Sequence, residues 1–469
     1  MNSARMTWVP PTSTFGNLLS TALCISSPGS ALTITREWRG DSGPTIFSST
    51  EPLFFLLLPR LSDCVALPGV LGHVKCDKRL MHALFRSTMI EADVCIVGAG
   101  IMGSAAAYWL SKNPSLKTIL IDQYSLLNSY CSSNDANRVF RYSYGANVFY
   151  TKMAVESRRL WVSLEKETGE SLLAPSGLLM LMGEDENSNN FNKSSYRTLT
   201  QSKLGAEWLE ARDMKRRFPQ FASTEAVFDP NAGTLLASKC LSLLSSRARE
   251  SGVQILDNTH VTSIASDSSV IIQTKNASDV KCGAAVIAAG PWSNPLRREN
   301  MVEITSTRQQ VVYFNPETRI SNYRSPKFPV FFADQYYGLP AAGIEGVKVS
   351  HKGVWTPVDP SEAERTVDPA TVEECRKVCQ RFVPELADKP VLSTKVCLYD
   401  MTKDSDFVIG RDPKHASIVY GYGFSGHGFK FAILIGKLLA ELAVGEQNSF
   451  DIARFSPSRI PVSPVLPVA

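Results

Sequence analysis

The chain has 469 residues, of which 44% are hydrophobic and 20% are charged, the composition of an ordinary globular protein with enough apolar residues for a large core. The formal net charge is +4 and the basic residues are scattered, so the sequence shows no basic cluster of the kind that binds nucleic acid. No apolar run reaches the roughly 20 residues that span a bilayer, which excludes a membrane-spanning helix.

The ten cysteines follow no disulfide-framework spacing and are typical of reduced intracellular thiols. Cys375 and Cys379 lie one helical turn apart, but a structural zinc site needs four ligands, so no metal site is expected. The C-terminus carries no Ser-Lys-Leu signal. We expect a cytoplasmic protein, with a peroxisomal location as the alternative.

Residues 1–88 are rich in Ser, Thr, Pro and Leu and show no sustained hydrophobic period. A targeting segment, a disordered extension and a misplaced start upstream of Met89 all account for this composition, although the basic bias is weak for a mitochondrial presequence. We expect residues 1–90 to be a disordered extension or a gene-model artefact without a function of its own. Residues 458–469 form a Pro-rich tail.

From residue 92 the pattern predicts a strand, a glycine turn, a helix at 104–111 and a second strand at 118–121. Gly98, Gly100 and Gly103 form G-x-G-x-x-G: the first allows the tight turn, the second the close approach of a pyrophosphate, and the third close packing of helix on strand. Asp122 ends the second strand, where a carboxylate accepts hydrogen bonds from ribose hydroxyls. These features predict a dinucleotide site, without separating NAD from FAD.

Further along, helices are expected at 150–170, 241–251 and 430–442, and strands at 174–182, 225–237, 253–256, 270–273, 284–288 and 417–421. Residues 305–355 alternate and are rich in aromatic residues, which suits an antiparallel sheet. The fold class expected is α/β (α+β), a Rossmann-like domain interleaved with an antiparallel-sheet substrate domain. Nucleotide-binding parts are placed at about 91–150, 230–300 and 395–450, and substrate-domain parts at 151–229 and 301–394.

Four segments carry more specific motifs. Residues 421–431 read Gly-Tyr-Gly-Phe-Ser-Gly-His-Gly-Phe-Lys-Phe, and these glycines allow a ligand to approach the backbone. The segment is not the G-x-S-x-G motif of a hydrolase, because His427 stands where that motif has its last glycine. The others are Arg138-Val-Phe-Arg141, Tyr336-Tyr337-Gly-Leu-Pro followed by Gly346-Val-Lys348, and Cys397-Leu-Tyr-Asp-Met-Thr followed by residues 404–410.

With these motifs, residues 92–457 resemble the monomeric sarcosine oxidase family of flavoprotein amine oxidases, whose fold is of the D-amino acid oxidase and glutathione reductase type. The resemblance implies FAD, held covalently through Cys397. It implies that Arg141 and Lys430 clamp a substrate carboxylate, that Tyr337 lines the substrate cavity, and that Lys348 lies beside the flavin and serves its reaction with oxygen. The cofactor-binding residues it implies are Gly98, Gly100, Gly103, Asp122, Arg138, Cys397, Gly426, His427, Gly428 and Lys430.

The reaction implied is oxidation of the secondary amine of an N-substituted or cyclic amino acid to an imine, with O2 reduced to H2O2, by a chain expected to be a monomer. Two alternatives stay open: a biosynthetic flavoenzyme that uses the same oxidation for cyclisation, and a flavoprotein dehydrogenase that does not use oxygen. The chain departs from the sarcosine oxidase pattern at Ser133-Asn134-Asp135, where that pattern has histidines, and the variant is similar to the fungal branch. His351 is one residue short of the family spacing.

Overall fold

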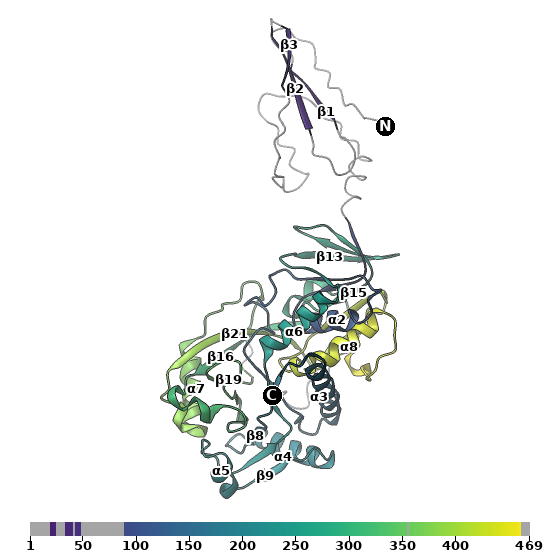
Figure 1. Ribbon diagram of the computed structural model, residues 1–469. Helices are drawn as coiled ribbons and strands as arrows, with labels where there is room; N and C mark the ends of the chain where they lie inside the picture. The colour runs from purple at the N-terminus through teal and green to yellow at the C-terminus, as the bar shows by residue number, and fades with distance from the viewer. Residues whose placement is uncertain (1–18, 25–32, 41–42, 48–88, 354–355, 461–469) are drawn as a thin grey trace. The chain divides into compact units, whose positions relative to one another are not determined.

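The computed structural model describes residues 19–24, 33–40, 43–47, 89–353 and 356–460. The chain divides into two units, residues 1–85 and 86–469. The first contains three strands, paired antiparallel in chain order: β1 (Leu19–Cys24), β2 (Thr33–Gly40) and β3 (Gly43–Phe47) (Figure 1). Most of residues 1–90 lie outside the described residues, so their assignment as an extension stays a prediction.

The second unit is built on two large sheets. The first has eight strands in the order β12-β5-β4-β15-β14-β13, with β23 beside β15 and β22 beside β23. Its centre is parallel, through β12–β5, β5–β4, β4–β15 and β15–β23, whereas β13, β14 and β22 pair antiparallel. The strands are β4 (Ile90–Val97), β5 (Thr118–Ile121), β12 (Gln254–Leu256), β13 (Val261–Ser266), β14 (Val270–Thr274), β15 (Val280–Ile287), β22 (Val408–Arg411) and β23 (Ile418–Tyr422).

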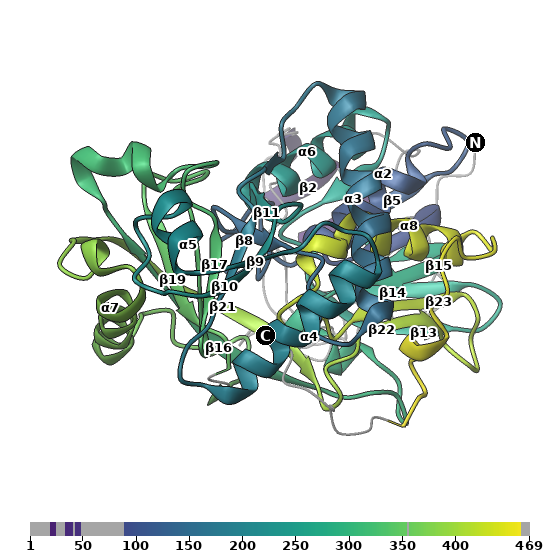
Figure 2. The same ribbon diagram turned by 90° about the horizontal axis from the view of Figure 1, so that it is seen from below.

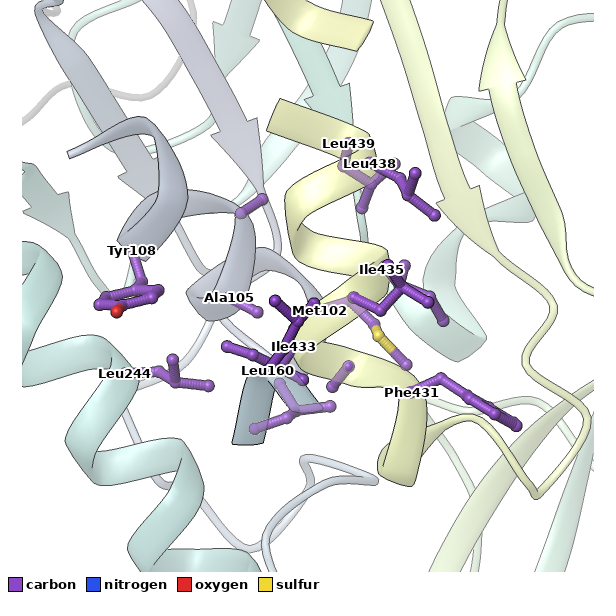
Figure 3. Packing of buried hydrophobic residues seen from close by; sticks show 14 of the residues in the cluster. Met102, Ala105, Tyr108, Leu160, Leu244, Phe431, Ile433, Ile435, Leu438 and Leu439 are labelled. Carbon is purple, nitrogen blue, oxygen red and sulfur yellow. The ribbon is translucent and has the colours of Figure 1, made fainter. Parts of the chain in front are cut away.

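Three helices pack together against this sheet, α2 (Ile101–Leu110), α6 (Ala237–Glu250) and α8 (Ala432–Ala443). The contact of α2 with α8 is close because both helices present small residues: a Cβ on Gly436 would lie 2.4 Å from the Cβ of Ala105. Figure 3 shows the apolar side chains around this contact, among them Met102, Ile433 and Ile435. Such packing fixes the start of α2, next to the glycine turn, relative to the start of α8.

The second sheet has nine strands in the order β20-β16-β19-β18-β17-β8-β10-β9, with β21 also paired to β16. Its pairs are antiparallel, as expected for residues 305–355, except for the parallel pair of β17 with β8. The strands are β8 (Leu178–Leu181), β9 (Glu207–Leu209), β10 (Ala226–Asp229), β16 (Ile304–Phe314), β17 (Val330–Ala333), β18 (Tyr336–Leu339), β19 (Val347–His351), β20 (Thr356–Pro357) and β21 (Val391–Thr402).

Helix α7 (Pro369–Phe382) covers part of this sheet and buries Cys375 and Cys379 in its core, as expected of a helix face rather than a metal site (Figure 2). A small antiparallel sheet, β6-β11-β7, completes the unit with strands β6 (Arg138–Phe140), β7 (Leu173–Ala174) and β11 (Gly233–Leu235). The remaining helices are α3 (Val148–Thr168), α4 (Glu186–Gln201), α5 (Ala211–Arg217) and the 3-10 turns Gly290–Trp292, Asn294–Leu296, Glu317–Tyr323, Pro384–Leu386, Phe429–Phe431 and Ala453–Phe455.

The fold class predicted from the sequence is confirmed, because a Rossmann-like β4–α2–β5 unit is interleaved with a largely antiparallel second sheet. Several boundaries differ from those expected. Helix α6 begins at Ala237 and not at residue 241, and α2 begins at Ile101, directly after the glycine turn, and not at residue 104. This difference places the helix N-terminus against the glycines. In the described part of the chain, no helix combines the length and apolarity needed to cross a membrane.

Candidate functional site

The glycine turn between β4 and α2 is shaped by two kinds of constraint. Gly98 has φ +104°, and a Cβ there would lie 2.4 Å from the carbonyl oxygen of Ala288; a Cβ on Gly103 would lie 1.8 Å from the carbonyl oxygen of Gly98. Gly100 differs, because its Cβ would meet nothing closer than the Oγ of Ser133 at 3.5 Å. The protein's own packing therefore requires Gly98 and Gly103, whereas Gly100 leaves room for a group from outside the chain.

Asp122 lies where the sequence predicts it, at the end of β5 beside the glycine turn. Its carboxylate accepts hydrogen bonds from the backbone N–H of Ala99 at 2.6 Å and of Tyr124 at 2.9 Å. Burial raises the pKa of Asp122, and these two donors oppose that change. A carboxylate has about four acceptor positions, so two remain for hydroxyl donors such as those of a ribose.

A single cavity of about 330 Å³ runs from this turn to the sequence-predicted substrate residues. Gly98, Gly100 and Asp122 line one part of it, and the loop from Ser425 to Lys430 lines another. Arg138, Arg141, Tyr337 and Lys348 line the same cavity, so the structure brings together residues that are up to 330 positions apart in the chain. Of the predicted site residues, Gly103 and Cys397 are the two that do not line it, and His351 also lies outside the lining, packed on the ring of Tyr336.

Lys348 is fully buried and is held by a carboxylate that the sequence analysis did not select. Its Nζ donates to Asp135 at 2.7 Å and to the carbonyl oxygen of Asn137 at 2.8 Å. Burial lowers the pKa of Lys348 to about 8, although the charge of Asp135 raises it. The structure thus keeps a cation in an apolar interior by giving it one fixed counter-charge.

Asp135 joins three segments of the chain. Besides Lys348, its carboxylate accepts from the guanidinium of Arg138 and from the hydroxyl of Tyr313 at 2.6 Å. Burial alone would raise the pKa of Asp135, but the charges of Lys348 and Arg138 hold it well below its usual range. Asp135 is therefore ionised and sets the positions of two cations that line the cavity.

A second cluster surrounds Lys430 at the start of α8. Its Nζ donates to the hydroxyl of Tyr144 at 2.8 Å and to the carbonyl oxygen of His427 at 2.6 Å. The Tyr144 hydroxyl lies 3.2 Å from Nδ1 of His427, whose Nε2 lies 3.1 Å from the carbonyl oxygen of Ser405. Since a carbonyl only accepts, Nε2 carries the proton and Nδ1 accepts from Tyr144. Burial and the charge of Lys430 lower the pKa of His427 well below its usual value, which agrees with a neutral ring.

Arg141 packs against the same tyrosine. Its guanidinium carbon is 4.1 Å from the centre of the Tyr144 ring, and Nζ of Lys430 is 5.4 Å from that centre. Burial lowers the pKa of Lys430 well below its usual value, and the charge of Arg141 lowers it further. An anion placed near both cations would relieve this repulsion, as the predicted carboxylate clamp requires.

Cys397 lies in β21, one residue before the cavity-lining Leu398, and is buried. The guanidinium of Arg138 donates to its Sγ at 3.6 Å, so a fixed positive charge faces the sulfur. The adjacent loop depends on Gly426, because a Cβ there would lie 2.5 Å from the ring of Tyr399. Cys397 therefore lies next to the cavity wall with its sulfur in contact with Arg138.

These residues fit a dinucleotide that carries a planar ring system. The open position at Gly100 and the start of α2 suit a diphosphate, and Asp122 suits a ribose. The ring would lie toward Arg138, Lys348 and the glycine-rich loop.

Sequence reasoning missed Asp135, Tyr144 and Lys352, all of which contribute to this site. Asp135 is part of the departure from the family pattern, but the sequence does not show its role because its partners come from distant segments. The alternation of side chains along a strand could have indicated Lys352, because residues 348 and 352 fall on the same side of an extended segment.

Comparisons with known proteins agree with this geometry. A family model described as FAD dependent oxidoreductase matches residues 93–442. Monomeric sarcosine oxidase of Bacillus sp. (strain B-0618) is 31% identical over 380 residues, which cover 78% of this chain and 96% of that protein. Peroxisomal sarcosine oxidase of Homo sapiens is 33% identical over 384 residues, covering 79% and 96%.

Among solved structures, a mutant of NikD, described as an unusual amino acid oxidase essential for nikkomycin biosynthesis, superposes with a TM-score of 0.70. It is 22% identical, and the match covers 79% of this chain and 98% of that one. This likeness shows that the two chains share a fold.

Proposed function

Because the chain belongs to the family of FAD-dependent oxidoreductases and is a homologue of monomeric sarcosine oxidase, we propose that it oxidises the secondary amine of an N-substituted or cyclic amino acid to an imine, with O2 as the acceptor and H2O2 as the second product. FAD supplies the electron-accepting ring, and the protein supplies position, charge and exclusion of water.

The observation that carries this proposal is the buried Lys348 in the cavity that also contains the glycine turn. A cation with a fixed counter-charge at Asp135 stabilises negative charge that develops beside it, without having to reorganise. Reduction of O2 develops such a charge. The proposed role of Lys348 is therefore to favour oxygen as the acceptor, which separates an oxidase from a dehydrogenase of the same fold.

Arg141 and Lys430 are proposed to bind the substrate carboxylate. Both line the cavity, both are buried, and both lie within 5.4 Å of the centre of the Tyr144 ring. The guanidinium offers a planar pair of donors and the ammonium a point charge, a combination that fixes a carboxylate from two directions. Tyr337 belongs to β18 of the second sheet, lines the cavity, and is proposed to contact the substrate.

FAD is proposed to be held covalently through Cys397. The support is the positive charge of Arg138 at 3.6 Å from the sulfur, in a segment whose next residue lines the cavity. The glycine-rich loop from Gly426 to Gly428 is proposed to lie against the cofactor, with His427 fixed by its two ring hydrogen bonds.

A peroxide-coupled screen tests the function on the purified full chain. N-alkyl and cyclic amino acids are each supplied in air, with peroxide measured by a coupled dye and with catalase as the control. The proposal expects peroxide from at least one such amine and, under anaerobic conditions, bleaching of the flavin absorbance by the same amine. Bleaching without peroxide in air would contradict the oxidase and leave a dehydrogenase. An absence of bleaching by the whole panel would refute amine oxidation.

A further inference from the structure

We propose that Tyr144 positions the carboxylate clamp, by holding the ammonium of Lys430 at the end of a hydrogen-bond chain that runs in one direction. Tyr144 is a positioning residue, because the described residues that line the cavity include Lys430 and not Tyr144. The inference rests on the proposed function and deepens it, since it says what keeps Lys430 in place for the carboxylate of the substrate.

The direction of the chain is set at its far end, by the carbonyl oxygen of Ser405. That oxygen lies 3.1 Å from Nε2 of His427 and only accepts, so Nε2 carries the proton and Nδ1 of the same ring accepts. Nδ1 lies 3.2 Å from the hydroxyl of Tyr144, which therefore directs its proton to His427. Burial raises the pKa of Tyr144, so the hydroxyl keeps that proton. Toward Lys430, which donates to it at 2.8 Å, the Tyr144 oxygen acts as an acceptor.

This acceptor matters because Lys430 is buried, with 4% of its surface exposed. Burial and the charge of Arg141 both oppose the charged form of Lys430 and lower its pKa well below the usual value. Two neutral oxygens stabilise the ammonium, that of the Tyr144 hydroxyl and that of the His427 carbonyl at 2.6 Å. The three donors of an ammonium are tetrahedrally arranged, so these two bonds fix the direction of the third, which is left for a group in the cavity.

The ring of Tyr144 contacts the second cation of the clamp. The guanidinium carbon of Arg141 lies 4.1 Å from the centre of this ring, within the range of a cation–π contact. The ring of Tyr150 stacks on that of Tyr144, with ring centres 5.0 Å apart and an angle of 21° between the planes. Tyr144 thus touches both cations of the clamp, Lys430 through its hydroxyl and Arg141 through its ring.

Two stacked and buried tyrosines allow a matched comparison. Tyr144→Phe removes the acceptor for Lys430 and keeps the ring beside Arg141. Tyr150→Phe removes the neighbouring hydroxyl, which donates to Asp406 at 2.9 Å instead. If buried tyrosine hydroxyls at this place only support the packing, the two substitutions should have the same effect on ligand binding.

The probe is cyclopentanecarboxylate, the carbocyclic analogue of a cyclic amino acid, compared with its neutral amide, cyclopentanecarboxamide. Calorimetric titration of the flavin-containing full chain measures the affinity of both. Wild type and Tyr150→Phe should prefer the acid. Tyr144→Phe should bind the acid about 10- to 100-fold more weakly, the range for a lost hydrogen bond to a charged group, and bind the amide within about twofold of the wild type.

Turnover gives a second readout. For an amine found in the peroxide screen, Tyr144→Phe should raise KM by a similar factor and leave kcat within about threefold, because the carboxylate is bound alike in the ground state and the transition state. A defect in packing around the flavin would instead lower kcat.

An acid preference that survives Tyr144→Phe, or equal losses in Tyr144→Phe and Tyr150→Phe, would overturn the inference and leave the proposed function standing. Conversely, an acid preference that depends on Tyr144, in a protein that oxidises no amine, would support the inference and refute the proposed oxidation. A wild type that binds acid and amide equally would overturn both the inference and the carboxylate clamp.

Discussion

Asp135 is the residue whose removal tests the electrostatics of the site most severely. Asp135→Asn keeps the shape of the side chain but removes the negative charge that Lys348 and Arg138 share. The loss leaves two cations buried or nearly so without a counter-charge, and breaking a buried pair in this way costs about 3–5 kcal/mol. We expect a folded but destabilised protein.

The second effect of the substitution is on the protonation of Lys348. Its pKa is about 8 with Asp135 in place, and the carboxylate acts to raise that value. Two unit charges about 4 Å apart interact by roughly 4 kcal/mol at the effective dielectric of a protein site. The loss of half of this interaction energy would already shift the protonation equilibrium of Lys348 by more than tenfold. At pH 8 Lys348 would then be mainly neutral in the variant.

The assay is stopped-flow reoxidation of the reduced flavin by O2 between pH 6 and 9. Since a lysine is charged below its pKa, the variant should lose fast reoxidation at a lower pH than the wild type, with a rate at pH 8 reduced at least about tenfold. Tyr313→Phe is the matched control, because it removes a hydrogen bond to Asp135 and keeps every charge. A reoxidation rate and pH profile of Asp135→Asn equal to those of the wild type would refute this reasoning.

Two further outcomes are expected. Gly100→Ala should change the unfolding free energy of the FAD-free protein by at most about 0.5 kcal/mol yet weaken FAD retention, whereas Gly103→Ala should cost about 1–3 kcal/mol in unfolding experiments, because its Cβ has no room. Cys397→Ala should release its flavin into the supernatant on acid precipitation, whereas the wild-type pellet stays yellow; free flavin from the wild type would rule out the bond.

The nucleotide half of the site was predictable because its residues are close together in sequence. Gly98, Gly100, Gly103 and Asp122 lie within one β4–α2–β5 unit, whose geometry repeats wherever a strand, a glycine turn and a helix follow each other. The structure adds a distinction that the spacing does not contain: of these glycines, Gly100 is the one at which a Cβ would fit without a clash.

The substrate half was predictable only in part. Lys348, Arg141 and Lys430 were selected from motifs, and the structure brings them to one cavity. Asp135 could not be assigned a role from sequence, because its role exists only when Arg138, Tyr313 and Lys348 meet around it.

The central claim, that a fixed buried cation makes this flavoprotein an oxidase, is tested most directly by measuring both half-reactions of Lys348→Met. An amine found in the peroxide screen reduces the flavin without oxygen, and O2 then reoxidises it, each followed by its visible absorbance. The account predicts that reoxidation slows far more than reduction, because the charge at Lys348 serves the oxygen step. Equal slowing of both steps, or unchanged reoxidation, would contradict it.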